Sequence, residues 1–409
     1  MKFSWIIACG LSGCLSQAVR AEDWRGFLGS TGNAYIAGAQ LPKEFSAASG
    51  DQAAKNIAWK TEIAGRAVSG PIVVGDRVFT TTSSGVESRW CEVICVDGKS
   101  GQVVWTRKIK TTGRPYCHPT SANAAPTPCS DGQHIFAFFS SNDLVCYDLD
   151  GNLKWYRGLA FDNPKAGNDV GMSSSPVVVG GVVVVQSECQ GDSFAMGIDA
   201  RSGSTLWQME RPHKPNWASP RVAQGADGQQ VVLLQSSTDL AAVDPRSGSE
   251  VWKVQQKCST VPSAVATNGR FYLPAGNLKA YDLPKGLEAP QRAWESSRVT
   301  PDNSSVVITD KAVLSVKGSV LSAVDFEGKL LWQVRLGELG QVWASPIVAG
   351  NTLFVFGIKG KCVAVDLAAP EAKVIATSEL GEEVLGTPAV MGNGLVVRSV
   401  RSLWKIAAQ

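Results

Sequence analysis

The feature that most constrains the fold of this chain is a short segment that recurs along most of its length. In residues 242–252 a small residue and a β-branched residue precede Asp244, a turn containing glycine follows, and an apolar run ends at Trp252. Each copy predicts a strand, a tight turn and a second strand. The aspartates and tryptophans of the copies are, in chain order, Trp59, Asp97, Trp105, Asp148, Trp155, Asp199, Trp207, Asp244, Trp252, Asp282, Trp294, Asp325, Trp332 and Asp366.

The spacing of these copies predicts the architecture. Successive tryptophans lie 38 to 52 residues apart, and a period of about 40–50 residues built from short strands is typical of a β-propeller. A second marker, a small or serine residue followed by an apolar run, opens each repeat. The openings contain Pro71, Pro128, Pro176, Pro220, Pro262, Ser305, Pro346 and Pro388. Eight openings predict an all-β, eight-bladed β-propeller with four antiparallel strands in each blade.

The two ends of the repeat region predict how the ring closes. After Pro388 the sequence supplies three strands but no fourth, whereas residues 59–63 form a strand with no blade before it. Pairing of these two ends completes the eighth blade and removes an open sheet edge. We therefore expect the propeller to comprise residues 59–409, with residues 22–58 as an N-terminal lead-in that packs on the ring.

The N-terminus is typical of an export signal. A lysine precedes the apolar run of residues 3–11, and Val19 and Ala21 fit a cleavage site, so residues 1–21 are predicted to be removed from a periplasmic or secreted protein. Residues 11–14 also fit a bacterial lipobox, and the alternative is a membrane-anchored lipoprotein modified at Cys14. No other apolar run is long enough to span a bilayer.

Composition excludes one class of partner. Charged residues make up 18% of the 409 residues and the net charge is only +3, so nucleic-acid binding is not expected. We expect the chain to be monomeric.

The cysteines divide into two groups. The position two before the repeat aspartate is always small, which predicts that Cys95 and Cys146 are small buried apolar residues. Equivalent sites on stacked sheets lie about 10 Å apart, too far for a disulfide. The sequence does not decide whether the second group forms disulfides. This group comprises Cys117, Cys129, Cys189, Cys258 and Cys362.

The long loops are expected on one face of the ring. In a meander, the loops between the second and third strands and between blades lie on the same face, and the long insertions all belong to this set in blades one to three. They comprise residues 83–90, 110–124, 158–173, 186–194 and 210–217. Long loops on a rigid scaffold often carry function, which predicts a site for an envelope protein partner or a small molecule here. The alternative is that the insertions are tolerated drift in loop length.

A few residues near this face are candidate ligand contacts. Trp217 and Trp343 occupy equivalent Trp-Ala-Ser-Pro openings and should face the mouth of the central channel, where an aromatic ring stacks on a flat ligand or simply packs the neck. Arg114 and His118 belong to one of the long loops. Asn168 and Asp169 are weak candidates for calcium ligands.

Several chemistries have no support in the sequence. The three histidines form no zinc pattern with cysteine, and there is no haem-attachment motif, nucleophile elbow or phosphate loop. Ser173, Ser174 and Ser175 belong to a repeat opening and are predicted to hydrogen-bond the ring neck rather than to act as nucleophiles. No catalytic residue is predicted.

The repeat resembles a known family. The Asp-x-x-x-Gly-x-x-x-Trp blade, with hairpins such as Ser-Pro-Val-Val-Val-Gly at Ser175, resembles the pyrroloquinoline-quinone (PQQ)-like propeller repeat from Trp59 to Ile406. The lead-in at residues 23–27 looks like that of a group of exported propellers of this kind. The resemblance implies one of two branches, the quinoprotein dehydrogenases or a non-enzymatic branch that includes the propeller lipoprotein of the outer-membrane β-barrel assembly machinery.

The dehydrogenase branch implies a quinone in the channel, a calcium ion held by a carboxylate and an amide, an aspartate base and, in many members, adjacent cysteines. This chain has no adjacent cysteines and its carboxylates do not match that motif, so PQQ and calcium stay possible cofactors without assigned ligands. The prediction is an exported binding or scaffold module of the cell envelope. The alternatives are a PQQ-dependent oxidoreductase of alcohols or sugars and a small-ligand sensor.

Overall fold

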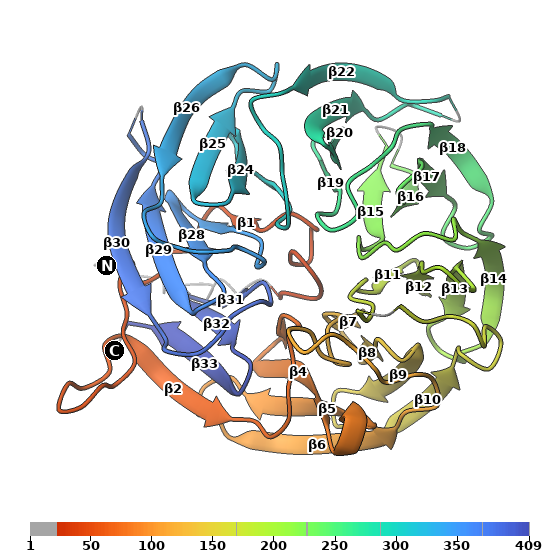
Figure 1. The fold of residues 1–409 in the computed structure, drawn as a ribbon, viewed down its shortest axis with the longest axis horizontal. Coiled ribbons are helices and arrows are strands. Elements are labelled where there is room, and N and C mark those ends of the chain that lie inside the picture. The colour runs from red at the N-terminus through yellow and green to blue at the C-terminus, as the bar shows by residue number, and fades with distance from the viewer. Residues whose placement is uncertain (1–22, 169, 226–227, 287, 370, 409) are drawn as a thin grey trace, which may run out of the picture.

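Eight sheets surround a central axis and close into a ring (Figure 1). The computed structural model describes residues 23–168, 170–225, 228–286, 288–369 and 371–408, so the predicted export signal, Cys14 and Asp169 lie outside it. Seven sheets have four strands and one has five. Within the described ranges the structure contains a single short helix, the 3₁₀ turn η1 (Val86–Ser88). The predicted all-β, eight-bladed propeller is confirmed.

The blades follow one another in chain order, each an antiparallel meander that runs outward from the axis (Figure 1). The strands of blades one to four are β3 (Ile72–Val74), β4 (Arg77–Ser84), β5 (Trp90–Asp97) and β6 (Val103–Lys110); β7 (Cys129–Ser130), β8 (His134–Phe138), β9 (Asp143–Asp148) and β10 (Leu153–Gly158); β11 (Val177–Val179), β12 (Val182–Ser187), β13 (Phe194–Asp199) and β14 (Thr205–Glu210); β15 (Arg221–Gln224), β16 (Gln230–Gln235), β17 (Leu240–Val243) and β18 (Glu250–Val254).

The remaining four blades repeat this arrangement, with one strand of the last blade taken from the N-terminal part of the chain. Their strands are β19 (Val265–Thr267), β20 (Arg270–Ala275), β21 (Asn277–Asp282) and β22 (Gln291–Ser296); β23 (Val307–Ile308), β24 (Val313–Lys317), β25 (Val320–Val324) and β26 (Leu330–Arg335); β27 (Ile347–Ala349), β28 (Thr352–Phe356), β29 (Lys361–Asp366) and β30 (Lys373–Glu379); β31 (Ala389–Met391), β32 (Gly394–Arg398), β33 (Ser402–Ala407) and β2 (Ile57–Glu62).

The ring closes through β2, as the sequence predicts. This strand pairs antiparallel with β33, and Trp59 faces Lys405. The strand begins two residues before the expected 59–63 and contains a register shift between Ile57 and Trp59. Closure gives the eighth blade its outer strand, and the first and last described strands of the ring thereby share one sheet.

The repeat tryptophans join neighbouring blades. The indole N–H of Trp59 donates to the carbonyl of Gly98 at 3.1 Å, and its ring lies against Gly101 of blade one. Gly101 has φ +76°, and a Cβ there would approach the indole to 2.7 Å, so the turn needs glycine for both its backbone and its space. The same indole-to-turn hydrogen bond is made by Trp105, Trp155, Trp207 and Trp294.

The repeat aspartates hold the turns that receive these tryptophans. Asp199 Oδ1 accepts hydrogen bonds from the backbone N–H groups of Arg201 at 3.2 Å and Ser202 at 2.7 Å. These N–H groups stabilise the ionised carboxylate and lower its pKa. The arrangement recurs in Asp97, Asp148, Asp244, Asp325 and Asp366. The aspartates therefore organise the turns and lie away from the axis.

A belt of hydroxyl groups surrounds the channel neck. In each case the backbone N–H of one member donates to the hydroxyl oxygen of its counterpart in the next blade, as Ser175 does to Ser219 at 2.9 Å. In blade one the equivalent residue is Gly70, whose backbone N–H donates to the hydroxyl of Thr127 at 2.9 Å. Glycine has no hydroxyl group, so Gly70 cannot accept such a bond through a side chain. The members of this hydroxyl belt are Thr127, Ser175, Ser219, Ser263, Ser305, Ser345 and Thr387.

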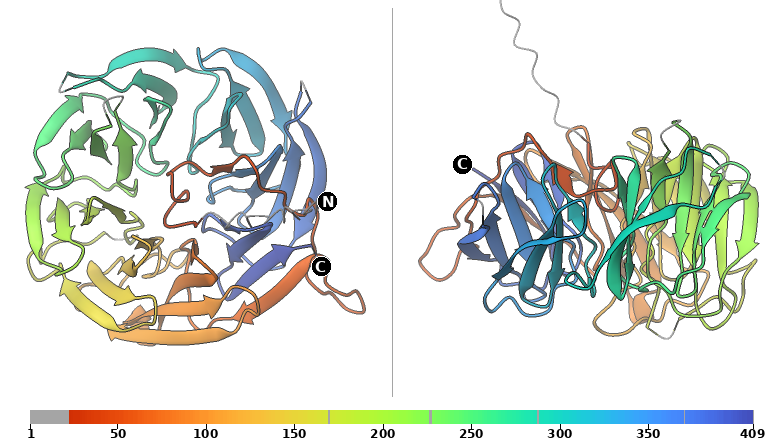
Figure 2. Two further views of the ribbon diagram at one scale, coloured as in Figure 1. Left: turned by 180° about the vertical axis from the view of Figure 1, so that it is seen from behind. Right: turned by 90° about the horizontal axis from the view of Figure 1, so that it is seen from above.

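The lead-in crosses one opening of the ring (Figure 2, left). Trp24 exchanges two backbone hydrogen bonds of 2.9 Å with Val73 of blade one. Asn33 reaches blade six, where its side chain exchanges hydrogen bonds of 2.7 and 3.0 Å with the backbone of Ile308. Strand β1 (Tyr35–Ile36) then adds to blade seven by pairing parallel to β27. None of the described helical segments has the length and apolar character needed to cross a membrane.

Candidate functional site

Phe27 of the lead-in lines two chambers near the axis of the ring. The loop-side chamber, of about 470 Å³, opens between the long loops and extends inward to Phe27. The lead-in-side chamber, of about 800 Å³, lies between residues 25–32 and the first strands of blades two to five, and Phe27 also lines it. One apolar side chain thus belongs to the walls of both chambers.

The loop-side chamber has an apolar mouth and a hydroxylated neck. The structure places three sequence candidates, His118, Trp217 and Trp343, in its lining. The indole N–H of Trp217 donates to the carbonyl of Gly171 at 2.7 Å, which fixes this ring. Trp343 is 39% exposed and lies at the rim. The deeper lining belongs to the hydroxyl belt, through Thr127, Ser175, Ser219, Ser263 and Thr387.

The other loop candidates lie outside this lining. The Arg114 guanidinium packs over the Tyr116 ring at 5.2 Å from its centroid. Asn168 is buried, its Oδ1 accepts the N–H of Val170 at 3.0 Å, and its Nδ2 has no hydrogen-bond partner. His118 shares a 2.8 Å hydrogen bond with the hydroxyl of Thr120, which holds the imidazole beside the mouth. The sequence predicted one region for these candidates. In the structure Trp343 lies at the rim of the chamber, Arg114 packs on Tyr116 outside the lining, and Asn168 is buried.

The calcium ion implied by the dehydrogenase branch does not fit the loop-side chamber. Calcium prefers several oxygen ligands and in such a site needs carboxylate. The described residues of this lining include the amides of Asn303 and Gln341 but no aspartate or glutamate. Nowhere in the described ranges do three or more His, Cys, Asp or Glu side chains form a metal-binding group.

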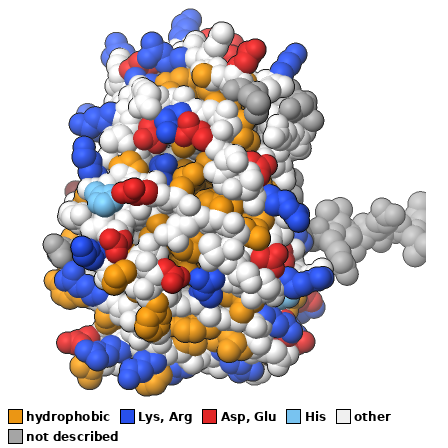
Figure 3. Space-filling model, turned by 90° about the vertical axis from the view of Figure 1, so that its right-hand side faces the viewer, with side chains coloured by type: hydrophobic (Ala, Val, Ile, Leu, Met, Phe, Trp, Pro, Cys, Tyr) orange, Lys and Arg blue, Asp and Glu red, His pale blue; other side chains and the backbone are white. Residues whose placement is uncertain are grey.

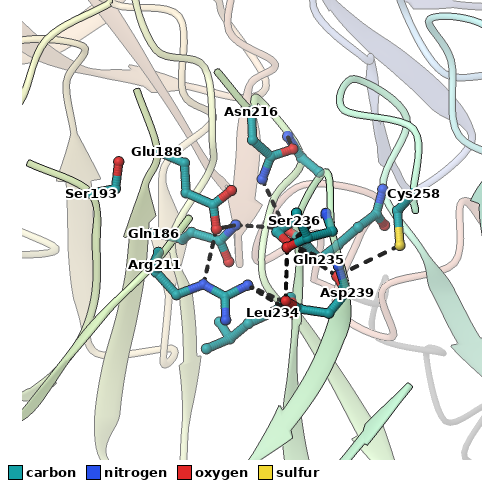
Figure 4. Close-up of polar contacts among 12 residues, drawn as sticks. Gln186, Glu188, Ser193, Arg211, Asn216, Leu234, Gln235, Ser236, Asp239 and Cys258 are labelled. Atoms are coloured by element: carbon teal, nitrogen blue, oxygen red, sulfur yellow. Dashed lines mark hydrogen bonds and ion pairs between the residues drawn. The ribbon is translucent and has the colours of Figure 1, made fainter. Parts of the chain in front are cut away.

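A buried charged network between blades three and four was not predicted from the sequence (Figure 4). Arg211 Nε donates to Glu188 Oε1 at 2.9 Å, and Arg211 Nη2 donates to the carbonyl of Leu234 at 3.1 Å. Asp239 Oδ1 lies 3.6 Å from the same guanidinium. Gln186 Nε2 bridges the blades by donating to Glu188 and to the carbonyl of Gln235. One guanidinium thus lies among two carboxylates and polar backbone.

The network contains a carboxyl group that titrates near neutrality. Burial raises the pKa of Glu188 to about 7, the Arg211 guanidinium opposes this rise, and the Asp239 carboxylate adds to it. Glu188 Oε2 has no hydrogen-bond partner. Neither chamber is lined by Glu188, so the group is placed to join blades rather than to meet a ligand. Its only sequence signal is the position of Glu188 and Arg211 within or beside predicted long loops.

The cysteines of the described ranges are all free thiols. Cys95 and Cys146 are buried among apolar side chains, and burial raises the pKa of each to about 12. Of the five whose pairing the sequence left open, Cys117 is half-buried and the other four are buried. Because the thiolate is the reactive form, such buried thiols are poor nucleophiles.

Exposed apolar side chains gather on the loop face. Val86, Tyr116, Phe161, Val170 and Trp343 are exposed there, Phe161 to 77%. Val170 and Trp343 line the loop-side chamber, and the other three belong to loops that a meander places at the same face. Outer strands also expose apolar side chains, such as Leu206 on β14, and the outer wall formed by β14 and β18 interleaves hydrophobic, basic and acidic side chains (Figure 3).

Comparison with known proteins gives one family. The family model described as outer membrane protein assembly factor BamB matches residues 26–171, 93–315 and 316–409. Outer membrane protein assembly factor BamB of Moranella endobia is 23% identical over 313 residues, covering 72% of this chain and 71% of that protein.

Two solved structures are similar in fold. The structure of BamB from Moraxella catarrhalis aligns with a TM-score of 0.63 at 16% identity, over 85% of this chain and 96% of that chain. Quinohemoprotein alcohol dehydrogenase from Comamonas testosteroni aligns with a TM-score of 0.70 at 13% identity, over 96% of this chain and 82% of that chain. At these identities the structural likeness establishes the shared propeller fold.

Proposed function

The chain belongs to the outer membrane protein assembly factor BamB family, and on that premise we propose that it is an exported binding module of the cell envelope that holds another protein at its loop face. In this proposal the propeller is a rigid scaffold, and the loops of blades one to three with the loop-side chamber form the contact surface. The envelope location follows from the export signal expected in residues 1–21, with a lipid at Cys14 as the alternative anchor.

The observation that carries this proposal is the apolar loop face around a chamber mouth. Apolar side chains grouped around a cavity are costly to leave in water and mark interaction sites. Phe161 and Tyr116 are exposed on the loops, and the exposed Trp343 lines the same chamber as Trp217, which a hydrogen bond fixes. A partner that inserts an apolar side chain between the two indoles would bury surface at the centre of the contact, where binding energy concentrates.

Site-specific photo-crosslinking in cells tests the contact surface. A photoreactive residue placed at Phe161, Tyr116 or Trp343 is expected to give one defined envelope protein as its product. The matched controls are Leu206 and Leu331, which are similarly exposed apolar residues on outer strands. Equal crosslinking from the controls, or no product from the loop positions, would overturn the proposal.

Affinity measurements with the purified partner sharpen the test. Trp343→Ala is expected to weaken binding by about tenfold or more, the loss typical of truncating a central aromatic anchor. Leu331→Ala is expected to leave the Kd unchanged. A Trp343 variant that binds like the native chain would remove the chamber mouth from the interface.

The enzymatic and sensor alternatives have their own readouts. Reconstitution with PQQ and calcium that produced a quinone absorbance band together with dye-linked oxidation of alcohols or sugars would contradict the scaffold proposal. A rise in melting temperature with a small molecule, without turnover and abolished by Trp343→Ala, would favour the sensor. The described lining without carboxylate makes the first outcome unexpected.

A further inference from the structure

Arg221 is a buried cation beneath the lead-in. It begins β15, is 4% exposed, and its Nη1 donates to the carbonyl of Phe27 at 2.8 Å. The guanidinium also lies 5.7 Å from the centroid of the Phe27 ring, within the range of a cation–π contact. Gly32 closes over the other side, since a Cβ there would lie 2.2 Å from Nη2. The lead-in thus holds the guanidinium in one place.

No carboxylate in the described ranges is paired with this guanidinium. Its Nε has no hydrogen-bond partner, and burial alone lowers the pKa of Arg221 to about 10. Arg211, which is equally buried, lies beside both Glu188 and Asp239. A buried charge without a partner is strongly unfavourable, so the contrast between the two arginines points to a counter-charge that the described residues do not supply.

The lead-in-side chamber provides room for that counter-charge. Arg221 lines this chamber of about 800 Å³ together with hydroxyl and amide groups of Ser30, Thr31, Ser130 and Asn268. The volume lies within the range of small-molecule sites. The hydroxyl groups of Ser30 and Thr31 already donate to the carbonyls of Asp23 and Asn33, so the Ser130 hydroxyl and the Asn268 amide are the lining donors suited to an anion beside Arg221.

The acidic residue of this lining is already engaged. Asp131 accepts hydrogen bonds from the N–H groups of Gln133 and His134 at 2.8 and 2.7 Å, and its other oxygen lies 3.0 Å from the His134 ring. Arg25 also lines the chamber, but it is paired with Asp23 at 2.7 Å. Arg221 is therefore the cation of this lining that has no acidic partner among the described residues.

We propose that the lead-in-side chamber binds a small organic anion through a carboxylate or phosphate group, with Arg221 as the counter-charge. The guanidinium suits both head groups because each brings a negative charge and hydrogen-bond acceptors to a cation that has no acidic partner among the described residues. The site is separate from the proposed protein contact, because Phe27 lies between the chambers and the lining here comes from the lead-in and the opposite turns. Failure of either proposal leaves the other intact.

Titration calorimetry on the exported chain tests the site. The probes are sodium phosphate, sodium succinate and neutral succinamide, each at matched ionic strength. The expected result is saturable binding of phosphate or succinate, with succinamide at least tenfold weaker. Preference for phosphate over succinate, or the reverse, distinguishes the two head groups. No saturable binding of either anion would overturn the proposal.

Variants distinguish a specific role of Arg221 in anion binding from a general effect of positive charge in the chamber. Arg221→Met is expected to weaken binding of the preferred anion at least tenfold, and Arg221→Lys to retain part of it. Gly32→Ala crowds Nη2 without changing the charge and is also expected to weaken binding. Arg25→Met, which removes a paired cation from the same lining, is expected to change affinity less than twofold. Equal affinities in Arg221→Met and the native chain would overturn the proposal.

Melting temperatures measured with and without the anion distinguish an anion site from a purely structural role of Arg221. If Arg221 serves only to hold Phe27, Arg221→Met melts at a lower temperature and neither chain is stabilised by the anion, which contradicts the proposal. If the chamber is an anion site, the native chain gains melting temperature with the anion and Arg221→Met does not. Far-UV circular dichroism of the variant establishes that the fold is retained in the comparison.

Discussion

At the scale of single residues, the chain places its least favourable charges where blades or segments meet. Glu188 lies at the contact of blades three and four, and Arg221 lies between blade four and the lead-in. Each is contacted by residues elsewhere in the sequence, Glu188 by Arg211 and Arg221 by Phe27. Repeat reasoning describes what blades share, so it did not identify residues whose role comes from a contact unique to one junction.

Glu188 makes stability depend on pH. Its pKa is about 7 in the folded chain against an ordinary 4.5, so the folded state binds a proton that the unfolded state releases between these values. Stability from this group is therefore present below pH 4.5 and is lost as the pH rises to 7, by about 3 kcal/mol at 1.36 kcal/mol per pH unit. We expect Glu188→Gln to remove this decline in urea unfolding measured at pH 5 and pH 7.5.

The control for this effect is Glu44→Gln, which alters an exposed carboxylate paired with Lys55. It should leave the slope between pH 5 and 7.5 unchanged. Carboxylates with a lowered pKa, such as Asp199, act with the opposite sign, because their stability is lost as pH falls below the ordinary value. The pH range over which these aspartates change stability is acidic and does not overlap the range between pH 5 and 7.5 used for Glu188. Parallel pH profiles of the native chain and Glu188→Gln would refute the prediction.

Gly101 offers a second residue-scale prediction. Alanine at this position combines a left-handed backbone with a Cβ 2.7 Å from the Trp59 ring, and we expect a loss of about 2–4 kcal/mol in unfolding free energy. Gly276→Ala is a matched control, since its φ is also +76° but no atom lies within 4 Å of the added Cβ. It should cost about 1 kcal/mol. Equal losses in the two variants would show that the Trp59 contact adds nothing to the strain.

At the scale of elements, the blades and their closure were predictable while the lead-in was not. Asp, Gly and Trp recur because each blade needs the same turn and the same contact with its neighbour, so eight blades and the role of β2 followed from counting. The lead-in has no repeat. Its path is set by single contacts, such as Asn33 with Ile308, between residues 275 apart in the sequence.

The lead-in is expected to be anchored by Phe45. This side chain is buried, its ring stacks on Phe356 at 6.1 Å, and its backbone N–H donates to the hydroxyl of Ser378 at 2.9 Å. Phe45→Ala should lower the unfolding free energy by about 3–5 kcal/mol, the usual cost of deleting a buried ring. It should also make the segment before β2 sensitive to protease under native conditions.

Phe161→Ala serves as the control for Phe45→Ala, because its ring is exposed and should contribute little to stability. Limited proteolysis with mass mapping then locates the cleavage. Protection of the lead-in in Phe45→Ala equal to that of the native chain would mean that Trp24 and Asn33 suffice to hold the segment.

At the scale of the whole molecule, the ring combines a repeated frame with one interrupted axis. The frame could be read from the sequence because its contacts recur in every blade. The positions of Trp217 and Trp343 near the channel also followed from the repeat, since equivalent openings lie at equivalent places around the axis. The place of Phe27 in the walls of both chambers could not be predicted, because it depends on where a non-repeating segment enters the ring.

The hydroxyl belt gives a prediction about how the ring shares its stability. Each bond joins only two neighbouring blades, so belt positions on different sides of the ring should act independently. Ser219→Ala removes the acceptor for the N–H of Ser175, and Ser345→Ala removes the acceptor for Ser305. Each is expected to cost about 1–3 kcal/mol, because a buried N–H loses its partner.

The double variant of Ser219 and Ser345 should cost the sum of the single losses within about 0.5 kcal/mol, as expected for sites without shared partners. The adjacent pair Ser175→Ala with Ser219→Ala is the comparison, because both changes act at residue 175: the first removes its hydroxyl, which accepts the N–H of Thr127, and the second removes the acceptor for its own backbone N–H. Its loss should depart from additivity. Chemical unfolding of the five variants measures both quantities. A strong coupling between Ser219 and Ser345 would contradict this prediction. It would mean that a change at one belt position alters the stability of blades that it does not contact.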